Sequence, residues 1–264
     1  MIELDWDELL SSNQFRKQRV ALAVGVFDGL HLGHRKLIER VVKSQPHLLP
    51  VVVTFRQNPR HILTNQTLRT TILPFEQKLK LLAELGIKLI VAVDFSQKFS
   101  KMKAIDFVKN LTNSFLLKKI VVGENFYFGR NREASAQILA GIGSNLGILV
   151  DVVNTVQYKG SRVSSTRLRH LLTEGNFQEA RAMMLSDYRV WIPPQADIQK
   201  EESYCQLLLK DLTQLVPTPG QYRCILEGEE LMTEQIINIS QHAVSWYEQG
   251  DRVKAICFKE KIKS

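Results

Sequence analysis

VALAVGVFDGLHLGHRKLIER, residues 20–40, is the stretch that decides the fold of this chain. It opens with the apolar run Val20–Val24, which is typical of a buried strand, and closes with apolar residues at helical spacing from Leu37 to Val42. A turn punctuated by glycines, residues 25–34, joins the two. A strand, a glycine turn and a helix in this order aim backbone N–H groups and a positive helix end at an anion. The stretch therefore predicts a site for a phosphate group.

His31 and His34 stand three positions apart where the predicted helix begins. At this spacing two imidazoles lie near one another and can reach the same phosphate group. Glycine turns between strands and helices are common in α/β proteins, and an isolated histidine is usually a polar surface residue. A His-x-Gly-His motif directly after a buried strand and a Phe-Asp-Gly turn favours a nucleotide-handling site, because motif and expected context agree.

The composition indicates a globular protein in a reducing compartment. With 264 residues, 44% hydrophobic and 23% charged, the chain can hold one large domain or a large and a small one. No apolar run approaches a membrane span, and the acidic N-terminus lacks the pattern of a secretory signal. Three widely spaced cysteines, Cys205, Cys224 and Cys257, indicate neither a disulfide framework nor a zinc site. We therefore expect a cytoplasmic protein that does not bind membranes.

Positive charge is concentrated in the first part of the chain. The formal net charge is +8, yet residues 189–264 hold nine Lys and Arg against eleven Asp and Glu. The positive excess thus belongs to residues 1–188, where it would attract anionic substrates. Lysines and arginines are scattered along predicted helices and form no basic run interleaved with aromatics. Charged residues scattered in this way are typical of helix faces exposed to solvent. Nucleic acid is therefore not an expected partner.

Residues 1–188 alternate between predicted strands and helices. Apolar runs predict strands at residues 20–24, 48–55, 88–94, 120–123 and 148–155. Further helices are predicted at residues 75–85, 104–116, 133–145, 164–173 and 177–184. Near-continuous apolar strands separated by helices predict a doubly wound parallel sheet of five strands, Rossmann-like and of the α/β class. Ligands bind such sheets at the carboxyl ends of the strands. The candidate ligand-binding loops are therefore those at residues 25–34, 55–60, 123–132 and 160–169.

Two of these loops carry unusual side chains. The segment GENFYFG, residues 123–129, holds three aromatic rings that either stack on a planar ligand or pack as ordinary hydrophobic residues. The segment RVSSTRLR, residues 162–169, opens a predicted helix with hydroxyl groups and three arginines. The hydroxyl groups can serve as helix caps, but capping does not need arginines. Hydroxyls, N–H groups and guanidinium forks together suit a di- or triphosphate.

Three segments in this order resemble the adenylyltransferase module of bacterial FAD synthetases, nucleotidyltransferases that carry a His-x-Gly-His motif. They are residues 25–34, the segment VGENFYFG at residues 122–129 and the segment VSSTRLR at residues 163–169. The likeness covers about residues 15–187. It implies transfer of AMP from ATP to the phosphate of FMN, with FAD and pyrophosphate as products and Mg²⁺ bridging phosphate oxygens.

The resemblance also implies a role for each matching residue. The catalytic residues would be His31, His34 and Arg167. The rest of the ATP site would comprise Gly25, Val26, Phe27, Asp28, Gly33, Asn58, Arg162, Ser164, Ser165 and Thr166. The flavin side would comprise Asn125, Phe126 and Phe128. The imidazoles and the arginines are expected to face each other across one crevice, with Asp28 holding the turn or lying near the metal. No residue is assigned as a metal ligand.

One segment departs from the family pattern. Where the family usually has Asp-Pro-His-Pro after the second strand, this chain has Arg-Gln-Asn-Pro at residues 56–59. The amide of Asn58 can hydrogen-bond a phosphate oxygen but cannot carry a charge, as an imidazole can. Arg56 either supplies the missing charge or is a surface residue.

Residues 189–264 are expected to form a small β-rich domain after a nucleotidyltransferase domain of residues 1–188. Strands are predicted at residues 205–209, 222–227, 235–239 and 252–258, with a linker at residues 191–195. This part resembles a truncated riboflavin kinase barrel. Because the Gly-rich segment and the Pro-Thr-Ala-Asn motif of that kinase are absent, kinase activity is not predicted.

Two other functions stay open on the sequence. One is nucleotidyl transfer to another phosphorylated acceptor. The other is a homologue that binds a flavin or a nucleotide without catalysis. His31, His34 and Arg167 argue against the second, whereas Asn58 and the shortened C-terminal part keep it open. The sequence predicts no oligomeric state.

Overall fold

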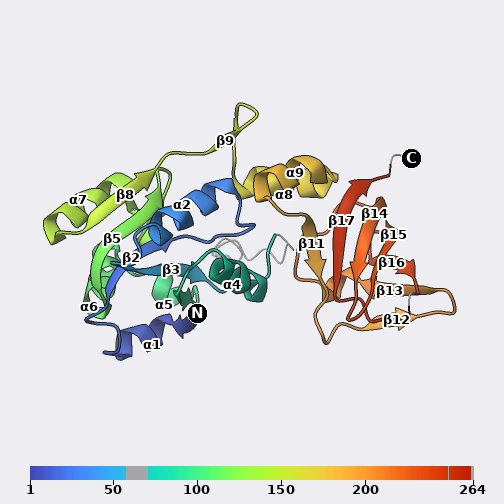
Figure 1. The fold of residues 1–264 in the computed structure, drawn as a ribbon, viewed down its shortest axis with the longest axis horizontal. Helices are drawn as coiled ribbons and strands as arrows, with labels where there is room; N and C mark the ends of the chain where they lie inside the picture. The colour runs from blue at the N-terminus through green and yellow to red at the C-terminus, as the bar shows by residue number, and fades with distance from the viewer. Residues whose placement is uncertain (58–70, 249, 263–264) are drawn as a thin grey trace. The chain divides into compact units, whose positions relative to one another are not determined.

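The computed structural model describes residues 1–57, 71–248 and 250–262 of the chain (Figure 1). The chain packs as two units, one formed by residues 1–67 and 75–162 and the other by residues 68–74 and 163–264. We describe each unit by itself.

A parallel sheet of six strands forms the centre of the first unit. Its order is β1-β4-β3-β2-β5-β8, and each strand runs parallel to its neighbours. The strands are β1 (Ile2–Asp5), β2 (Arg19–Val24), β3 (Leu49–Phe55), β4 (Leu89–Val93), β5 (Leu116–Gly123) and β8 (Leu149–Val153). From β2 the chain adds β3 and β4 on one side, and then β5 and β8 on the other. The strand order thus reverses at β2, the position where ligands bind in sheets of this kind.

The Rossmann-like α/β class is confirmed, but the expected number of five strands is wrong. The additional strand is β1, which pairs with β4 along all four of its residues. Its residues are exposed or half-buried because it lies at the edge of the sheet. So short an edge strand lacks a long apolar run, and its stability comes from backbone pairing with a distant segment.

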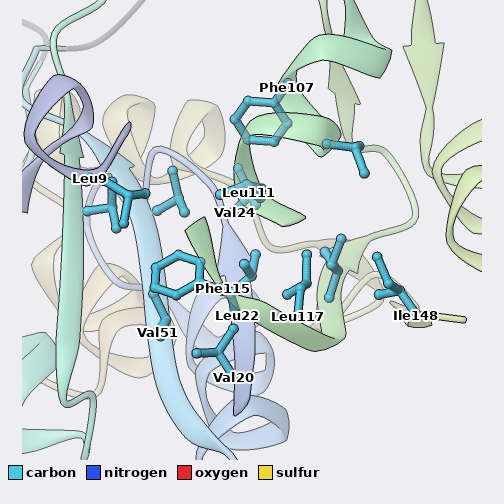
Figure 2. Close-up of a cluster of buried hydrophobic side chains, with 14 of the residues drawn as sticks. Leu9, Val20, Leu22, Val24, Val51, Phe107, Leu111, Phe115, Leu117 and Ile148 are labelled. Atoms are coloured by element: carbon cyan, nitrogen blue, oxygen red, sulfur yellow. The ribbon is translucent and has the colours of Figure 1, made fainter. Parts of the chain in front are cut away.

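Strand β2 is buried on both faces, as expected for the centre of a parallel sheet. On one face Val20, Leu22 and Val24 belong to a large apolar cluster (Figure 2). The cluster also contains Leu9 of α1 (Trp6–Ser11) and Phe107 of α6 (Ala104–Ser114). The small side chains of Ala21 and Ala23 alternate with these and face the opposite side of the sheet.

Further helices and short hairpins complete the first unit. The helices are α2 (Leu32–Val42), α4 (Phe75–Glu84), α5 (Gln97–Ser100) and α7 (Ala136–Leu146), with a 3₁₀ turn η1 (Arg130–Arg132). Two hairpins are formed by β6 (Tyr127–Phe128) with β7 (Ala134–Ser135) and by β9 (Gln157–Tyr158) with β10 (Ser161–Arg162). Every helix predicted for this unit is present, with bounds that differ from the predicted ones by a few residues.

The second unit consists of two helices and an antiparallel sheet of seven strands. The helices are α8 (Ser165–Glu174) and α9 (Phe177–Met184). The sheet order is β11-β17-β14-β15-β16-β13-β12, which makes it an open, curled half-barrel. The strands are β11 (Tyr188–Trp191), β12 (Ile198–Lys200), β13 (Tyr204–Leu208), β14 (Gly220–Glu227), β15 (Met232–Ile239), β16 (Ala243–Tyr247) and β17 (Ala255–Lys261), with a 3₁₀ turn η2 (Leu209–Asp211).

The expected β-rich C-terminal part is confirmed, but the linker at residues 191–195 is wrong. Trp191 lies in β11, where it pairs with Ala255 of β17. The side chain of the next residue, Ile192, is buried, and its N–H donates to the carbonyl of Lys254. The two prolines that follow suggested a connection between domains, whereas pairing with the distant β17 makes the beginning of this segment part of the sheet.

Helices α8 and α9 pack on the sheet of the second unit. The ring of Phe177 in α9 lies 5.2 Å from that of Phe258 and 5.9 Å from that of Tyr222, between ring centroids. It also stacks on Tyr188, at 6.5 Å. The predicted domain boundary at residue 188 stays a prediction, because this packing does not tell which residues a nucleotidyltransferase domain needs.

Two glycines of α7 provide a matched test of packing in the first unit. A Cβ atom on Gly143 would lie 2.5 Å from Cγ2 of Val150 and 2.9 Å from the carbonyl oxygen of Ile148, whereas one on Gly141 would meet nothing within 4 Å. We expect Gly143→Ala to lower the free energy of unfolding by about 1–3 kcal/mol through overpacking. Gly141→Ala should raise it by up to about 1 kcal/mol through helix propensity. Urea denaturation of both variants measures this, and equal values would contradict the packing described here.

Candidate active site

The loop between β2 and α2, residues 25–31, follows the strand at which the sheet order reverses. Its backbone is unusual, because Phe27, Gly29 and Leu30 all have positive φ angles, of 54°, 78° and 37°. The side chains of Phe27 and Leu30 are nevertheless completely buried. Non-glycine residues in this conformation cost about 1–3 kcal/mol each and persist only where their surroundings hold them. The loop is therefore strained and anchored by its own apolar residues.

His31 is the N-cap of α2. Its Nδ1 accepts a hydrogen bond from the backbone N–H of His34, at 3.3 Å. A neutral His31 therefore carries its proton on Nε2, where it can be donated to a ligand. A Cβ atom on Gly33 would lie only 3.2 Å from Cε1 of His31. The glycine of the His-x-Gly-His motif thus makes room for the capping imidazole.

The two imidazoles form a stacked pair. The rings of His31 and His34 lie 3.7 Å apart between centroids, with 13° between their planes. The edge of the buried Phe27 ring packs against His34, at 5.3 Å. Two rings this close cannot both carry a positive charge without strong repulsion. The arrangement favours a pair of hydrogen-bonding groups over a pair of cations.

His34 is held in its neutral form. Burial lowers the pKa of its imidazole well below 6.5, and the positive charges of His31 and Lys78 lower it further. Its Nδ1 atom is buried and has no hydrogen-bond partner among the residues that the structure describes. A neutral imidazole at the start of a helix can still bind an anion through an N–H group.

Lys78 of α4 is a residue of this site that the sequence did not indicate. Its buried Nζ donates to the carbonyl oxygens of Val26, at 3.1 Å, and Phe55, at 2.8 Å. It also contacts the hydroxyl of Thr54, at 3.2 Å. Burial lowers the pKa of its ammonium group to about 8, although the charge of Asp28 raises it. Its burial could have been inferred from helical spacing, because Lys78 stands four positions before the buried Leu82 and so lies on the same face of α4.

The segment after β3 differs from the expectation for Arg56. Its guanidinium forms ion pairs with Asp5, at 2.5 Å, and Glu3, at 2.8 Å, and lies over the ring of Phe75. These carboxylates hold the pKa of Arg56 above its usual value. Arg56 is thus half-buried and paired with β1, and is not a free surface residue. That it also supplies charge to a phosphate stays a prediction. Asn58 lies outside the described residues.

The loop after β5 contains the three predicted flavin-site residues. The side-chain amide of Asn125 donates to Glu124, at 3.3 Å, and to Thr155 after β8, at 3.2 Å. Phe126 and Phe128 stack at 5.3 Å and are half-buried against the apolar cluster of Figure 2. Asn125 is thus exposed at the carboxyl ends of β5 and β8, while the two phenylalanines take part in packing.

The arginine-rich segment is divided between the two units. Arg162 is exposed in β10 of the first unit. The second unit begins one residue later and contains Ser164, the N-cap of α8, whose hydroxyl accepts from the N–H of Arg167, at 3.2 Å. Ser165 and Thr166 form the first turn of this helix. The capping interpretation of Ser164 is therefore correct.

Arg167 forms an ion pair with Glu179 of α9, at 2.5 Å, with both side chains about four-fifths buried.

The structure brings together part of the predicted site. In the first unit, His31, Gly33 and His34 lie at the end of the turn that begins at Gly25. The buried Asp28 of this turn lies near Lys78. Val26 takes part through its carbonyl group, and the ring of Phe27 lies beneath His34. The predicted approach of the arginines of α8 to these imidazoles stays a prediction, because the two groups belong to different units.

A metal site made by the protein alone is not seen in the described part of the chain, where no three His, Cys, Asp or Glu are grouped to hold an ion. Within the same residues, no helix has the length and apolar character needed to cross a bilayer.

The first comparison concerns sequence families. The sequence model of the FAD synthetase family matches residues 13–167, more than half of the 264-residue chain. The chain belongs to the FAD synthetase family. The match contains every residue that the sequence assigned to the site, from Gly25 to Arg167.

Curated relatives agree with this family. The bifunctional riboflavin kinase/FMN adenylyltransferase of Buchnera aphidicola (strain Sg) is 30% identical over 168 residues, which are 62% of this chain and 54% of that protein. The protein of the same name from Escherichia coli K12 is 29% identical over 175 residues, covering 65% and 56%. The FAD synthetase of Listeria monocytogenes is 26% identical over 166 residues, covering 62% and 67%. This member of the FAD synthetase family thus spans about half the length of its bifunctional relatives.

A solved structure has the same fold. It is a crystal structure from Streptococcus pneumoniae described as a macrolide-efflux protein, with a TM-score of 0.82 and 20% identity. The likeness covers 99% of this chain and 90% of that one. At this level of identity it concerns the fold alone.

The lowered pKa of His34 predicts how the stability of this family member depends on pH. As the pH falls through about 6.5, the unfolded chain binds a proton at residue 34 that the folded chain does not bind. The free energy of unfolding therefore decreases, by at most about 1.4 kcal/mol per pH unit for one proton. We expect His34→Gln to lose stability less steeply than the wild type between about pH 7.5 and 5.5.

Denaturation curves at several pH values measure this difference. His47→Gln is the control, because it removes an exposed histidine outside the stacked pair. Parallel pH profiles for the wild type and His34→Gln would show that the pKa of His34 does not differ between the folded and the unfolded protein, and would contradict the prediction.

Proposed function

We propose that this protein transfers AMP from ATP to FMN and produces FAD and pyrophosphate. The observation that carries the proposal is the stacked His31–His34 pair at the start of α2, at the position where the sheet order reverses. Membership of the FAD synthetase family supports it, as do relatives whose names include FMN adenylyltransferase.

The reaction needs positioning more than it needs a base. An oxygen of the FMN phosphate attacks the α-phosphorus of ATP, and the bond from that phosphorus to the bridging oxygen of pyrophosphate breaks. Because the attacking phosphate is already an anion, the barrier lies in aligning two anions and stabilising the departing one. We propose that His31 and His34 donate N–H groups to α- and β-phosphate oxygens, assisted by the N-terminus of α2.

We propose that Mg²⁺ enters the site with the nucleotide substrate. Mg²⁺ is usually bound through one or two carboxylates together with substrate phosphates. The described residues supply few such ligands, of which the buried Asp28 lies in the loop before α2. Mg²⁺ would neutralise phosphate charge, and Asp28 would hold the turn in place near it.

The remaining assignments keep the roles that the sequence predicted. We propose that the segment around Arg167 binds the β- and γ-phosphates, through Arg162, Ser164, Ser165, Thr166 and Arg167. Asn125 would contact the flavin side, together with Phe126 and Phe128. Asn58 would contact a phosphate. Riboflavin kinase activity is not expected, because the kinase motifs are absent. We further propose a cytoplasmic protein that binds neither nucleic acid nor membranes.

Purified protein with ATP, Mg²⁺ and FMN tests the function. FAD appears with FMN as the acceptor, and riboflavin in place of FMN gives no FMN, as measured by chromatography with flavin fluorescence. Product formation with a different phosphorylated acceptor only would favour another nucleotidyltransferase. Flavin or ATP binding without turnover would indicate a homologue that has lost catalysis.

His31→Asn separates capping from catalysis, because asparagine is also a good N-cap residue. We expect kcat for FAD formation to fall about a hundredfold or more through loss of a charge-stabilising donor, while the melting temperature changes little. His47→Asn, at an exposed position, is the control and should retain the wild-type rate. A wild-type kcat for His31→Asn would remove His31 from the catalytic residues.

Arg167 and Glu179 form a matched pair of positions. Both Arg167→Gln and Glu179→Gln break the ion pair between α8 and α9, but only the first removes the guanidinium. If Arg167 binds phosphate, kcat/KM for ATP should fall about tenfold or more in Arg167→Gln and remain near the wild-type value in Glu179→Gln. Equal losses in steady-state assays would assign Arg167 to packing alone.

A further inference from the structure

The ammonium group of Lys78 connects two loops at the edge of the sheet where the His31–His34 pair lies. Its bond to the carbonyl of Val26 holds the loop after β2, and its bond to the carbonyl of Phe55 holds the end of β3. Thr54 contributes a third contact and donates its own hydroxyl to Val26, at 3.2 Å. Lys78 therefore ties the loop after β2 to the end of the neighbouring strand β3.

Stability alone does not account for a lysine at this place. Burying an ammonium group costs several kcal/mol, and an apolar side chain of similar volume is often as good or better for stability. The lowered pKa of Lys78, about 8, reflects this cost. Buried charges with strongly shifted pKa values are concentrated at functional sites. The position next to the strained turn suggests what the charge does there.

Lys78 reaches the histidine pair through two contacts. Val26, whose carbonyl it binds, directly precedes Phe27, a residue with a positive φ angle. The buried ring of Phe27 in turn packs against the ring of His34. At the other end of the turn, Nε of Arg35 donates to the carbonyl of Leu30, at 3.2 Å. Two cationic side chains thus hold the strained turn, one at each end.

We propose that Lys78 is a positioning residue, which holds the turn after β2 so that His31 and His34 present their N–H groups to the reacting phosphates. The role rests on the proposed adenylyl transfer. The titratable groups around the ammonium are the carboxylate of Asp28, in the turn, and the neutral imidazole of His34, in α2. On the side of β3, the guanidinium of Arg56 lies over the same Phe75 ring as the Lys78 ammonium. Lys78 acts through the turn and needs no contact with the substrate.

Lys78→Met and Lys80→Met form the decisive comparison. Both remove one positive charge from α4, but Lys80 is exposed. Methionine is close to lysine in length and leaves no buried charge, so the variant should fold. We expect Lys78→Met to lower kcat about tenfold or more, with KM for ATP and FMN changed less than about threefold, in protein that remains folded at the assay temperature. A kcat equal to that of Lys80→Met would overturn the positioning role.

Thr54→Val provides a second variant, should Lys78→Met fail to fold. It removes the hydroxyl that bonds to both Lys78 and Val26, while the side-chain shape and the ammonium remain. A decrease in kcat at unchanged KM supports the positioning role, and wild-type kinetics overturns it.

A third measurement separates this inference from the proposed function. In protein with ¹⁵N-labelled histidine, the imidazole signals of His31 and His34 should shift in Lys78→Met and keep their wild-type positions in Lys80→Met. This comparison needs no turnover. A wild type that forms no FAD, together with shifted imidazole signals, would refute the proposed reaction and leave the connection from Lys78 to the histidines intact. Unchanged signals would refute the connection itself.

Discussion

The turn between β2 and α2 is the constraint on which the site depends. Within a few residues the chain leaves a strand that is buried from Val20 onward, adopts positive φ angles at Phe27 and Leu30, and enters a helix. Conformations of this kind persist only where the surroundings hold them. Here the buried rings and alkyl groups of the turn, together with the cations of Lys78 and Arg35, provide that support. The geometry of the histidine pair follows from it.

The position of this turn follows from the topology of the sheet. Because strands are added first on one side of β2 and then on the other, the loops after β2 and β5 diverge and leave a place for a ligand. Strand β2 is one of the central strands that are buried on both faces, together with β3 and β4. The His-x-Gly-His turn therefore follows a strand with a strongly apolar sequence.

In the second unit, the start of α8 has structural roles beside the one proposed for it in phosphate binding. Ser164 caps α8, and Arg167 connects α8 to α9 through Glu179. Helix α9 packs on the curled sheet through Phe177, so the start of α8 is oriented by aromatic packing within that unit. Hydroxyl and guanidinium groups that already have structural partners can still bind a polyphosphate, since each has more than one donor. The proposed role in phosphate binding is therefore compatible with capping.

The sequence by itself determined the elements with strong local patterns. The apolar runs of β2, β3 and β4, the amphipathic helices and the His-x-Gly-His motif were predictable because each is specified by neighbouring residues. The edge strand β1, the pairing of Trp191 with Ala255, the ion pairs of Arg56 and the burial of Lys78 were decided only by the tertiary structure. In each case the stabilising partner is a backbone or side-chain group far away in the sequence, and a local pattern contains no information about it. A lysine is predicted to lie at the surface until the structure shows carbonyl groups of the loop after β2 and of the end of β3 around its ammonium.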